Sequence, residues 1–155
     1  MRGMRWLLPL LLLPAALFAE TPTPAKTDTP YIVHADILVE TEKTEAVDES
    51  TEKEGRYAIP GETSSARTPL ATPEFLYMAE SLPPSTLRLY PFERVNGRRE
   101  IFLRKKKKIL VEPLRMTLLP VDGNLVKLRV LDSLSEGEYC LTPDGSNAAF
   151  CFTVH

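Results

Sequence analysis

The chain has 155 residues, a formal net charge of −2 at pH 7, 43% hydrophobic residues and 26% charged residues. This length suits one modest domain with an additional segment and excludes a large multidomain protein. A zinc site would need both histidines, His34 and His155, as well as both cysteines, and no C-x-x-C motif is present. We therefore expect no metal and no cofactor.

The first 19 residues have the pattern of a signal peptide. Two arginines precede an apolar run over 6–18, which ends at the small residue Ala19. The run is shorter than the about 20 residues that span a bilayer, and Pro9 and Pro14 interrupt it. We predict export to the periplasm, the cell surface or the medium, with no stable transmembrane span in the mature chain. The alternative is that the signal peptide is kept as an anchor.

Residues 20–72 form an acidic segment rich in Thr, Glu and Pro. Between 20 and 66 the sequence has 11 acidic and 4 basic residues and few large apolar ones. Such a composition predicts disorder, because it buries too little apolar surface to offset the ordering entropy. Alternating apolar residues in "YIVHADILV" predict a strand at 31–39, either docked on the following domain or transient within the tail.

Residues 73–155 have a different pattern. The runs "FLYM", "TLRLYPF", "REIFL", "LRMTLL", "LVKLRVL", "EYCLT" and "FCFTV" are short and β-prone, and turn signals separate them. Seven such strands at this spacing predict an all-β sandwich.

The last hairpin predicts a disulfide. A four-residue loop at 144–147 places Leu141 opposite Phe150 and Cys140 opposite Cys151, with the cysteines at a non-hydrogen-bonded site where Cα atoms approach closely. In an oxidising compartment such a pair is expected to be bridged. The alternative is two unpaired thiols on the outer face of the hairpin.

Two other hairpins are predicted. A three-residue loop at 122–124 places Leu118 opposite Leu128. In the hairpin over 86–103, a two-residue Asn96-Gly97 turn would set Glu93 opposite Glu100, whereas a three-residue loop would set Glu93 opposite Arg99. Both registers remain open.

The stretches "LRLYPFERVNGRREIFL" and "LDSLSEGEYCLTPDGSNAAFCFTV" resemble an immunoglobulin-like β-sandwich module at the ends of uncharacterised secreted bacterial proteins. The resemblance covers about residues 83–155. Glu136 stands where a proline is common, and Thr153 where a glycine is common. The resemblance implies an architecture and a secreted setting, and it carries no catalytic residues. The matching residues are Leu134, Gly137, Glu138, Tyr139, Leu141, Phe150, Phe152 and Val154.

The most basic stretch is "RKKKK", formed by Arg104, Lys105, Lys106, Lys107 and Lys108. Such a run can bind a polyanion. The alternative is a loop or edge whose lysines prevent aggregation beside two apolar runs. No aromatic residues alternate with the lysines, as a base-stacking surface would require.

Some apolar residues are left over when the sandwich core is filled. The outer faces of their strands are expected to carry Leu119 and either Leu87 with Leu89 or Tyr90 with Phe92. An apolar patch of this kind marks an interaction surface, and the candidate patch is Leu119, Tyr90 and Phe92. The alternative is a second core layer covered by another part of the chain.

The sequence contains no recognisable pairing of a nucleophile with a base, and neither Asp-Gly turn has calcium-loop spacing. We therefore expect a protein that is not an enzyme. The leading hypothesis is an exported bacterial binding or assembly module whose partner is an envelope protein. The alternative is a protein that binds a polyanion through residues 104–108: an acidic wall polymer, an anionic lipid or a nucleic acid.

Overall fold

A computed structural model describes residues 14–15 and 22–155, so the predicted signal peptide lies outside the described residues except for Pro14 and Ala15. The described residues contain strands and one short 3-10 helix, η1 (Pro84–Thr86), but no α-helix. The strands are β1 (Tyr31–His34), β2 (Ile37–Glu40), β3 (Glu42–Glu45), β4 (Val47–Asp48), β5 (Glu54–Pro60), β6 (Arg67–Thr68), β7 (Glu74–Met78), β8 (Leu87–Val95), β9 (Arg98–Lys105), β10 (Lys108–Ile109), β11 (Met116–Asp122), β12 (Leu125–Val130), β13 (Gly137–Pro143) and β14 (Ala148–Val154).

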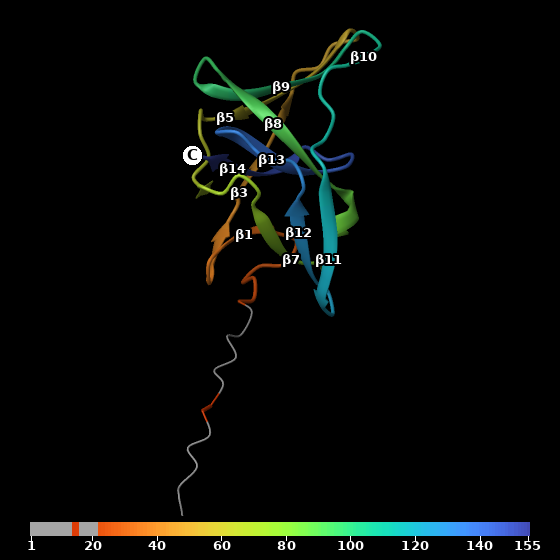
Figure 1. The fold of residues 1–155 in the computed structure, drawn as a ribbon. Helices are drawn as coiled ribbons and strands as arrows, with labels where there is room; N and C mark the ends of the chain where they lie inside the picture. Colours follow the sequence, from red (N-terminus) through yellow and green to blue (C-terminus); the bar gives the residue numbers. More distant parts are fainter. Residues whose placement is uncertain (1–13, 16–21) are drawn as a thin grey trace, which may run out of the picture.

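These strands form two sheets, which Figure 1 shows at the lower and upper ends of the molecule. The first sheet has the order β11-β12-β7-β1-β2. The second follows the path β3-β14-β13-β8-β9-β5-β4, with β10 paired to β9 and β6 paired to β14. Only the β6–β14 pairing is parallel among the described strands. The prediction of an all-β fold is confirmed.

The main core lies between the two sheets. Phe75 of the first sheet contacts Phe152 of the second, with ring centroids 5.2 Å apart, and Tyr139 stacks on Phe152 at 5.7 Å. Alternate residues of β8, β13 and β14 point into this core because side chains on a strand alternate between its two faces. Two layers of sheet packed face to face are the arrangement of a β-sandwich.

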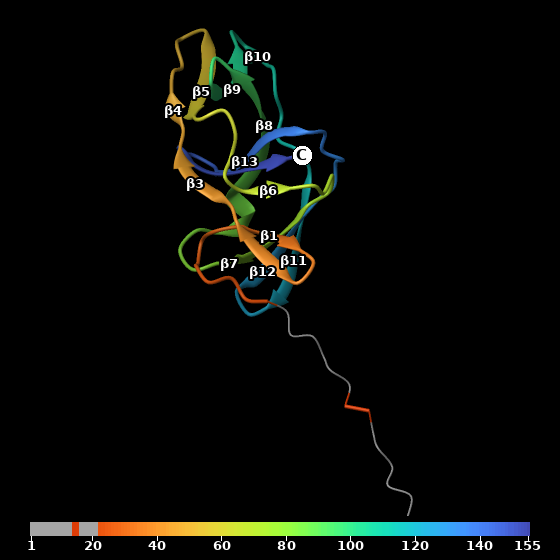
Figure 2. The same ribbon diagram turned by 90° about the vertical axis from the view of Figure 1, so that its left-hand side faces the viewer.

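The segment 42–48 closes the second sheet on itself. Its first half, β3, pairs with β14, and its second half, β4, pairs with β5 at the other end of the strand order. Only Ala46 separates the two halves, and its backbone N–H donates to the carbonyl of Asn147. The strands from β14 to β5 are therefore rolled into a ring, seen beside β3 and β4 in Figure 2.

A second core fills the interior of this ring. It consists of side chains that point away from the first sheet, from five strands of the ring. The buried members are Ile59, Phe92, Ile101, Cys140, Ala149 and Cys151.

The prediction that residues 20–72 are disordered is wrong for the described residues 22–72, which hold β1 to β6. The composition of a segment indicates only whether that segment can form a hydrophobic core by itself. Here Ile59 is buried in a core supplied mainly by later strands. β3 gains backbone hydrogen bonds by pairing with β14, and β5 by pairing with β9. The domain therefore begins before the predicted boundary at residue 73.

The predicted strand at 31–39 consists of two strands, β1 and β2. Ala35 adopts a left-handed conformation with φ of 54°, which turns the chain back between them. β1 docks on β7, with Tyr31 opposite Leu76 and Ile32 opposite Phe75. The docked interpretation of this segment is therefore correct, although a turn interrupts the strand.

Asp28 fixes the entry into β1. Its carboxylate accepts hydrogen bonds from the backbone N–H groups of Glu80, Ser81 and Leu82 at 2.8–3.1 Å. Burial by itself would raise the pKa of the Asp28 carboxyl group, but these donors outweigh it and hold the pKa below its usual value. The carboxylate therefore joins the start of the described domain to the turn after β7.

The predicted register of the last hairpin is confirmed. Cys140 pairs with Cys151, Leu141 with Phe150 and Tyr139 with Phe152, around a loop at 144–147. The predicted pairing of Leu118 with Leu128 also holds. There a bulge between Pro120 and Asp122 shortens the loop to Gly123 and Asn124.

The β8–β9 hairpin takes the register with like charges opposite each other, Glu93 with Glu100 and Arg94 with Arg99. Its two-residue turn has positive φ at Asn96 and Gly97, as a type I′ turn requires. Cross-strand repulsion does not prevent this register because three of the four side chains have opposite-charge partners elsewhere. Arg94 pairs with Glu138, Arg99 with Glu42, and Glu100 with Arg56 and Arg98.

In the described part of the chain, no helix is both long enough and apolar enough to cross a membrane.

Candidate functional site

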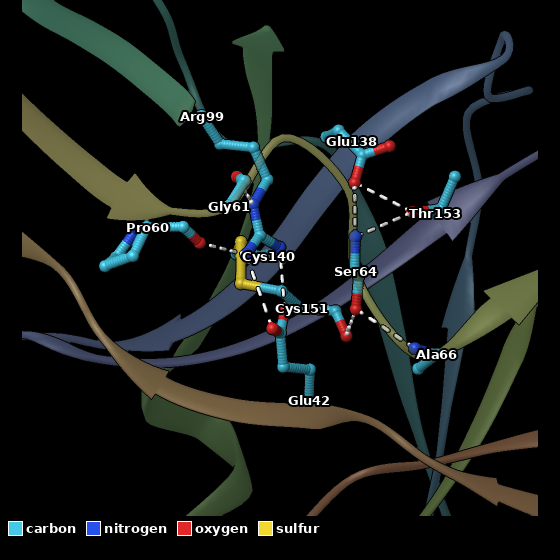
Figure 3. Close-up of a disulfide and its surroundings, with 10 residues drawn as sticks. All are labelled: Glu42, Pro60, Gly61, Ser64, Ala66, Arg99, Glu138, Cys140, Cys151 and Thr153. Atoms are coloured by element: carbon cyan, nitrogen blue, oxygen red, sulfur yellow. Dashed lines mark hydrogen bonds and ion pairs between the residues drawn. A yellow bond between two sulfur atoms is a disulfide. The ribbon is translucent and has the colours of Figure 1, made fainter. Parts of the chain in front are cut away.

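Cys140 and Cys151 form a disulfide in the interior of the ring, as Figure 3 shows. This confirms the predicted bridge and excludes two unpaired thiols. Both residues are fully buried. The face of the hairpin opposite Tyr139 is therefore a core surface, because Ile59, Phe92 and Ile101 belong to the same core cluster.

Arg99 lies beside the disulfide and is also fully buried. Its guanidinium donates to the Glu42 carboxylate at 2.7 Å and to the carbonyls of Gly61 and Pro60 at 3.0 and 2.8 Å (Figure 3). A buried cation is tolerated when its hydrogen bonds and its charge are satisfied together. This cluster ties β9 to β3 and to the end of β5.

Glu138 is another buried charge of the ring. Its carboxylate accepts hydrogen bonds from the backbone N–H of Ser64 at 2.9 Å and the hydroxyl of Thr153 at 2.7 Å, and it pairs with Arg94 at 2.6 Å. The hydrogen bond to Glu138 raises the pKa of Arg94. These contacts satisfy the carboxylate and fix the loop between β5 and β6, so a structural role accounts for them.

A cavity of about 320 Å³ opens beside the loop at 144–147. Its walls are mainly aromatic and aliphatic, and its rim is the polar loop between β13 and β14. The lining residues are Ala46, Tyr57, Tyr90, Phe92, Ile101, Leu103, Thr142, Pro143, Asp144, Gly145, Ser146 and Asn147.

Tyr90 and Asp144 define the polar part of this cavity. Burial raises the pKa of the Tyr90 phenol, and the Asp144 carboxylate adds to the effect. Asp144 in turn pairs with Arg88 at 3.0 Å. At neutral pH the cavity therefore presents a neutral phenol beside an ion pair.

The cavity adjoins a more open hollow of about 550 Å³, and the two share Tyr57, Tyr90 and Leu103 as lining residues. The hollow extends to Ile109 and Val111. We refer to the two together as the aromatic groove.

The residues of the predicted partner patch do not form one surface. Phe92 is buried in the ring, Tyr90 is half-buried in the aromatic groove, and Leu119 lies half-buried on β11 in the other sheet. The expectation of an exposed patch is wrong for Phe92, because the alternative of a second core layer accounts for it. Tyr90 and Phe92 do come together, as adjacent walls of the cavity.

The basic run forms a hairpin between β9 and β10. Lys105 pairs with Lys108 and Arg104 with Ile109, and Lys106 has a left-handed φ of 57° at the turn. None of the ion pairs among the described residues involves Arg104 or the four lysines. We refer to residues 104–110 as the basic hairpin.

The described residues contain no group of three or more His, Cys, Asp or Glu side chains placed to hold a metal ion. The residues lining the aromatic groove include the hydroxyls of Thr142 and Ser146 but no histidine to act as their base. Chemically, the groove suits the retention of an apolar group by contact and by hydrogen bonds at its rim.

Sequence reasoning missed Ala46 and Tyr57, which line the groove from the segment that was expected to be disordered. A signal was present in "GRYAIPG", where Tyr57 and Ile59 alternate between Gly55 and Gly61. The many Glu, Thr and Ser residues around this stretch nevertheless led to a prediction of disorder.

Comparisons of the chain with protein families, with curated proteins and with solved structures find no match.

Proposed function

We propose that this is an exported bacterial envelope protein, built on an immunoglobulin-like sandwich, that acts as a non-catalytic binding or assembly module. Its partner is an envelope protein that inserts an apolar side chain into the aromatic groove. The observation that carries this proposal is the cavity of about 320 Å³ with aromatic walls and a polar rim. Binding sites are typically concave and mostly apolar, with a few polar groups that orient the ligand.

Export is supported by two independent features. The first 19 residues have the composition of a signal peptide. The buried Cys140–Cys151 disulfide belongs to a type of bond that persists in oxidising compartments and is rare in the cytosol.

Site-specific photo-crosslinking in the native envelope tests the groove. A photoreactive residue at Tyr90 should give a discrete crosslinked partner, which mass spectrometry identifies and which is then purified for titration. The matched control places the same residue at Ile37, an exposed position on β2 of the other sheet. The proposal predicts a crosslink at Tyr90 that is absent at Ile37.

A Tyr90→Ala variant provides the quantitative arm of this test. It enlarges the cavity and should weaken binding of the purified partner by at least tenfold, while Ile37→Ala should leave binding unchanged. Equal affinities of the two variants, or the same crosslinks from both positions, would reject the groove as the binding site.

A second candidate function is polyanion binding through Arg104–Lys108. It is favoured by the exposure of the four lysines and by the lack of ion pairs to these five residues in the described structure. Retention on heparin that disappears at high salt and on replacing the lysines tests it. Groove binding, by contrast, should depend little on salt.

A further inference from the structure

The basic hairpin combines positive charge with exposed apolar side chains. This combination restricts the class of ligand that the hairpin can bind. We propose that it is a docking element for an anionic lipid surface, in which the lysines contact phosphate groups while Ile109 and Leu110 enter the boundary between headgroups and acyl chains. This inference rests on the second candidate function and narrows its polyanion to a lipid bilayer. The hairpin shares Arg104 and Ile109 with the outer hollow of the aromatic groove, but it does not include Tyr90, where the groove is tested.

The position of the hairpin suits contact with a large flat surface. In both ribbon views β10 lies at the extreme end of the molecule, opposite the end formed by the first sheet (Figures 1 and 2). The backbone N–H of Lys106 donates to the carbonyl of Lys53, and the Arg104 guanidinium donates to the carbonyl of Lys106. These bonds connect the tip to the residue before β5 and to itself, and all four lysines are exposed.

The charges of the hairpin differ from most other cations of the described chain. On β8 and at the start of β9, arginines have carboxylate partners at 2.5–3.0 Å, as Arg94, Arg98 and Arg99 illustrate. Lys105–Lys108 have no carboxylate partner within the described residues. Four adjacent unpaired ammonium groups leave a positive field that an external anion can neutralise.

The apolar component directly follows the four lysines in sequence. Ile109 and Leu110 are 63% and 45% exposed, among the most exposed large apolar side chains of the described structure. Leu110 and the four lysines line one shallow hollow. Exposed aliphatic residues beside lysines are the combination that binds anionic bilayers, where apolar burial and charge attraction act together.

A nucleic acid fits the hairpin less well. Single-stranded nucleic acids are bound by aromatic side chains on which bases stack, and the hairpin contains none. Two aliphatic side chains make no favourable contact with a phosphate backbone, but they can be buried among the acyl chains at the surface of a bilayer.

Co-sedimentation of the mature protein with vesicles tests the proposal. Binding is expected to vesicles that contain phosphatidylglycerol and not to vesicles of phosphatidylcholine alone, and it should fall as salt rises. Lys105→Gln, Lys107→Gln and Lys108→Gln together should weaken partitioning about 100-fold, since each lysine near an anionic surface contributes about fivefold. Lys106 is kept because of its left-handed conformation.

A charge-matched control replaces Lys26, Lys43 and Arg67 with Gln. These are exposed cations outside the hairpin, so the net charge changes equally while the hairpin is intact. The control should bind vesicles nearly as well as the unchanged protein. Near-UV circular dichroism and intact mass establish that both triple variants keep their fold and disulfide. Equal binding by the two triple variants would overturn the proposal.

The aliphatic pair separates lipids from other polyanions. Ile109→Gln with Leu110→Gln should reduce vesicle binding at least tenfold and leave retention on heparin unchanged. If the protein binds heparin or single-stranded DNA through the lysines but does not bind the vesicles, the lipid assignment is wrong and polyanion binding stands. If it binds neither, both are wrong.

Discussion

The buried guanidinium of Arg99 on β9 forms an ion pair of 2.7 Å with the half-buried carboxylate of Glu42 on β3. Along the strand order β3 and β9 are separated by three other strands, so this pair spans the interior instead of joining neighbours. The same guanidinium also donates hydrogen bonds to two backbone carbonyls at the end of β5. One side chain thus holds three segments of the ring together.

Replacing Arg99 with Ala should destabilise the protein by about 3–5 kcal/mol, because a fully buried side chain is removed and Glu42 and two carbonyls lose their hydrogen-bond donor. Denaturant unfolding measures the loss. Arg115→Ala is the matched control, since the Arg115–Asp132 pair lies at the surface and its removal should change stability little. Similar losses for the two variants would show that the buried pair has no special role.

Replacing both Cys140 and Cys151 with Ala should lower the free energy of unfolding by roughly 2–3 kcal/mol, mainly because the unfolded chain gains freedom. Intact-mass measurement of the unchanged protein should show the gain of two hydrogens on reduction. Because both cysteines are fully buried, a mild reductant should act only on protein that has opened. Rapid alkylation of native protein without reductant would contradict the bridge.

Removing residues before Pro73 should prevent cooperative folding. The shortened chain would lack β3 to β5, so Phe92, Ile101 and the disulfide would face water. We expect weak near-UV circular dichroism and binding of a hydrophobic dye. A chain starting at Pro22 is the control and should melt cooperatively, because it keeps all the described strands. A cooperative transition at the same temperature in both would show that the ring is dispensable.

Lowering the pH should remove the stability that the ionised Glu100 carboxylate contributes to the fold. A hydrogen bond from Arg56 holds the pKa of Glu100 below its usual value, and Arg98 contributes in the same direction. A carboxyl group with a lower pKa in the folded state adds stability above its unfolded pKa of about 4.3, and this is lost as pH falls through the folded value. Glu100→Gln should therefore be less stable than the unchanged protein at pH 7.

The difference between Glu100→Gln and the unchanged protein should shrink in thermal melts as pH falls below about 4. A difference that stays constant from pH 7 to pH 3 would mean that the charge of Glu100 does not matter.

The last hairpin could be predicted from sequence because its information is local. Turn residues, alternation and the facing cysteines all agree on one register, and the structure has it. The role of Tyr57 and Ile59 could not be predicted in the same way, since their burial depends on β8, β9 and β13, which lie far along the chain. For the β8–β9 hairpin, the local charges oppose the observed register, and only the distant partners Glu42 and Glu138 explain it.

Closure of the ring also has a kinetic consequence. Ser64, in the loop after β5, donates its backbone N–H to Thr153, which is 89 positions away, and β3 must wait for β14 before it can pair. Chains with such distant contacts fold slowly, because loop closure must precede the contacts that reward it. A chain made or translocated from its N-terminus can therefore complete the ring only after its last strand has emerged, so we expect its early strands to stay open, and accessible to chaperones, throughout that interval.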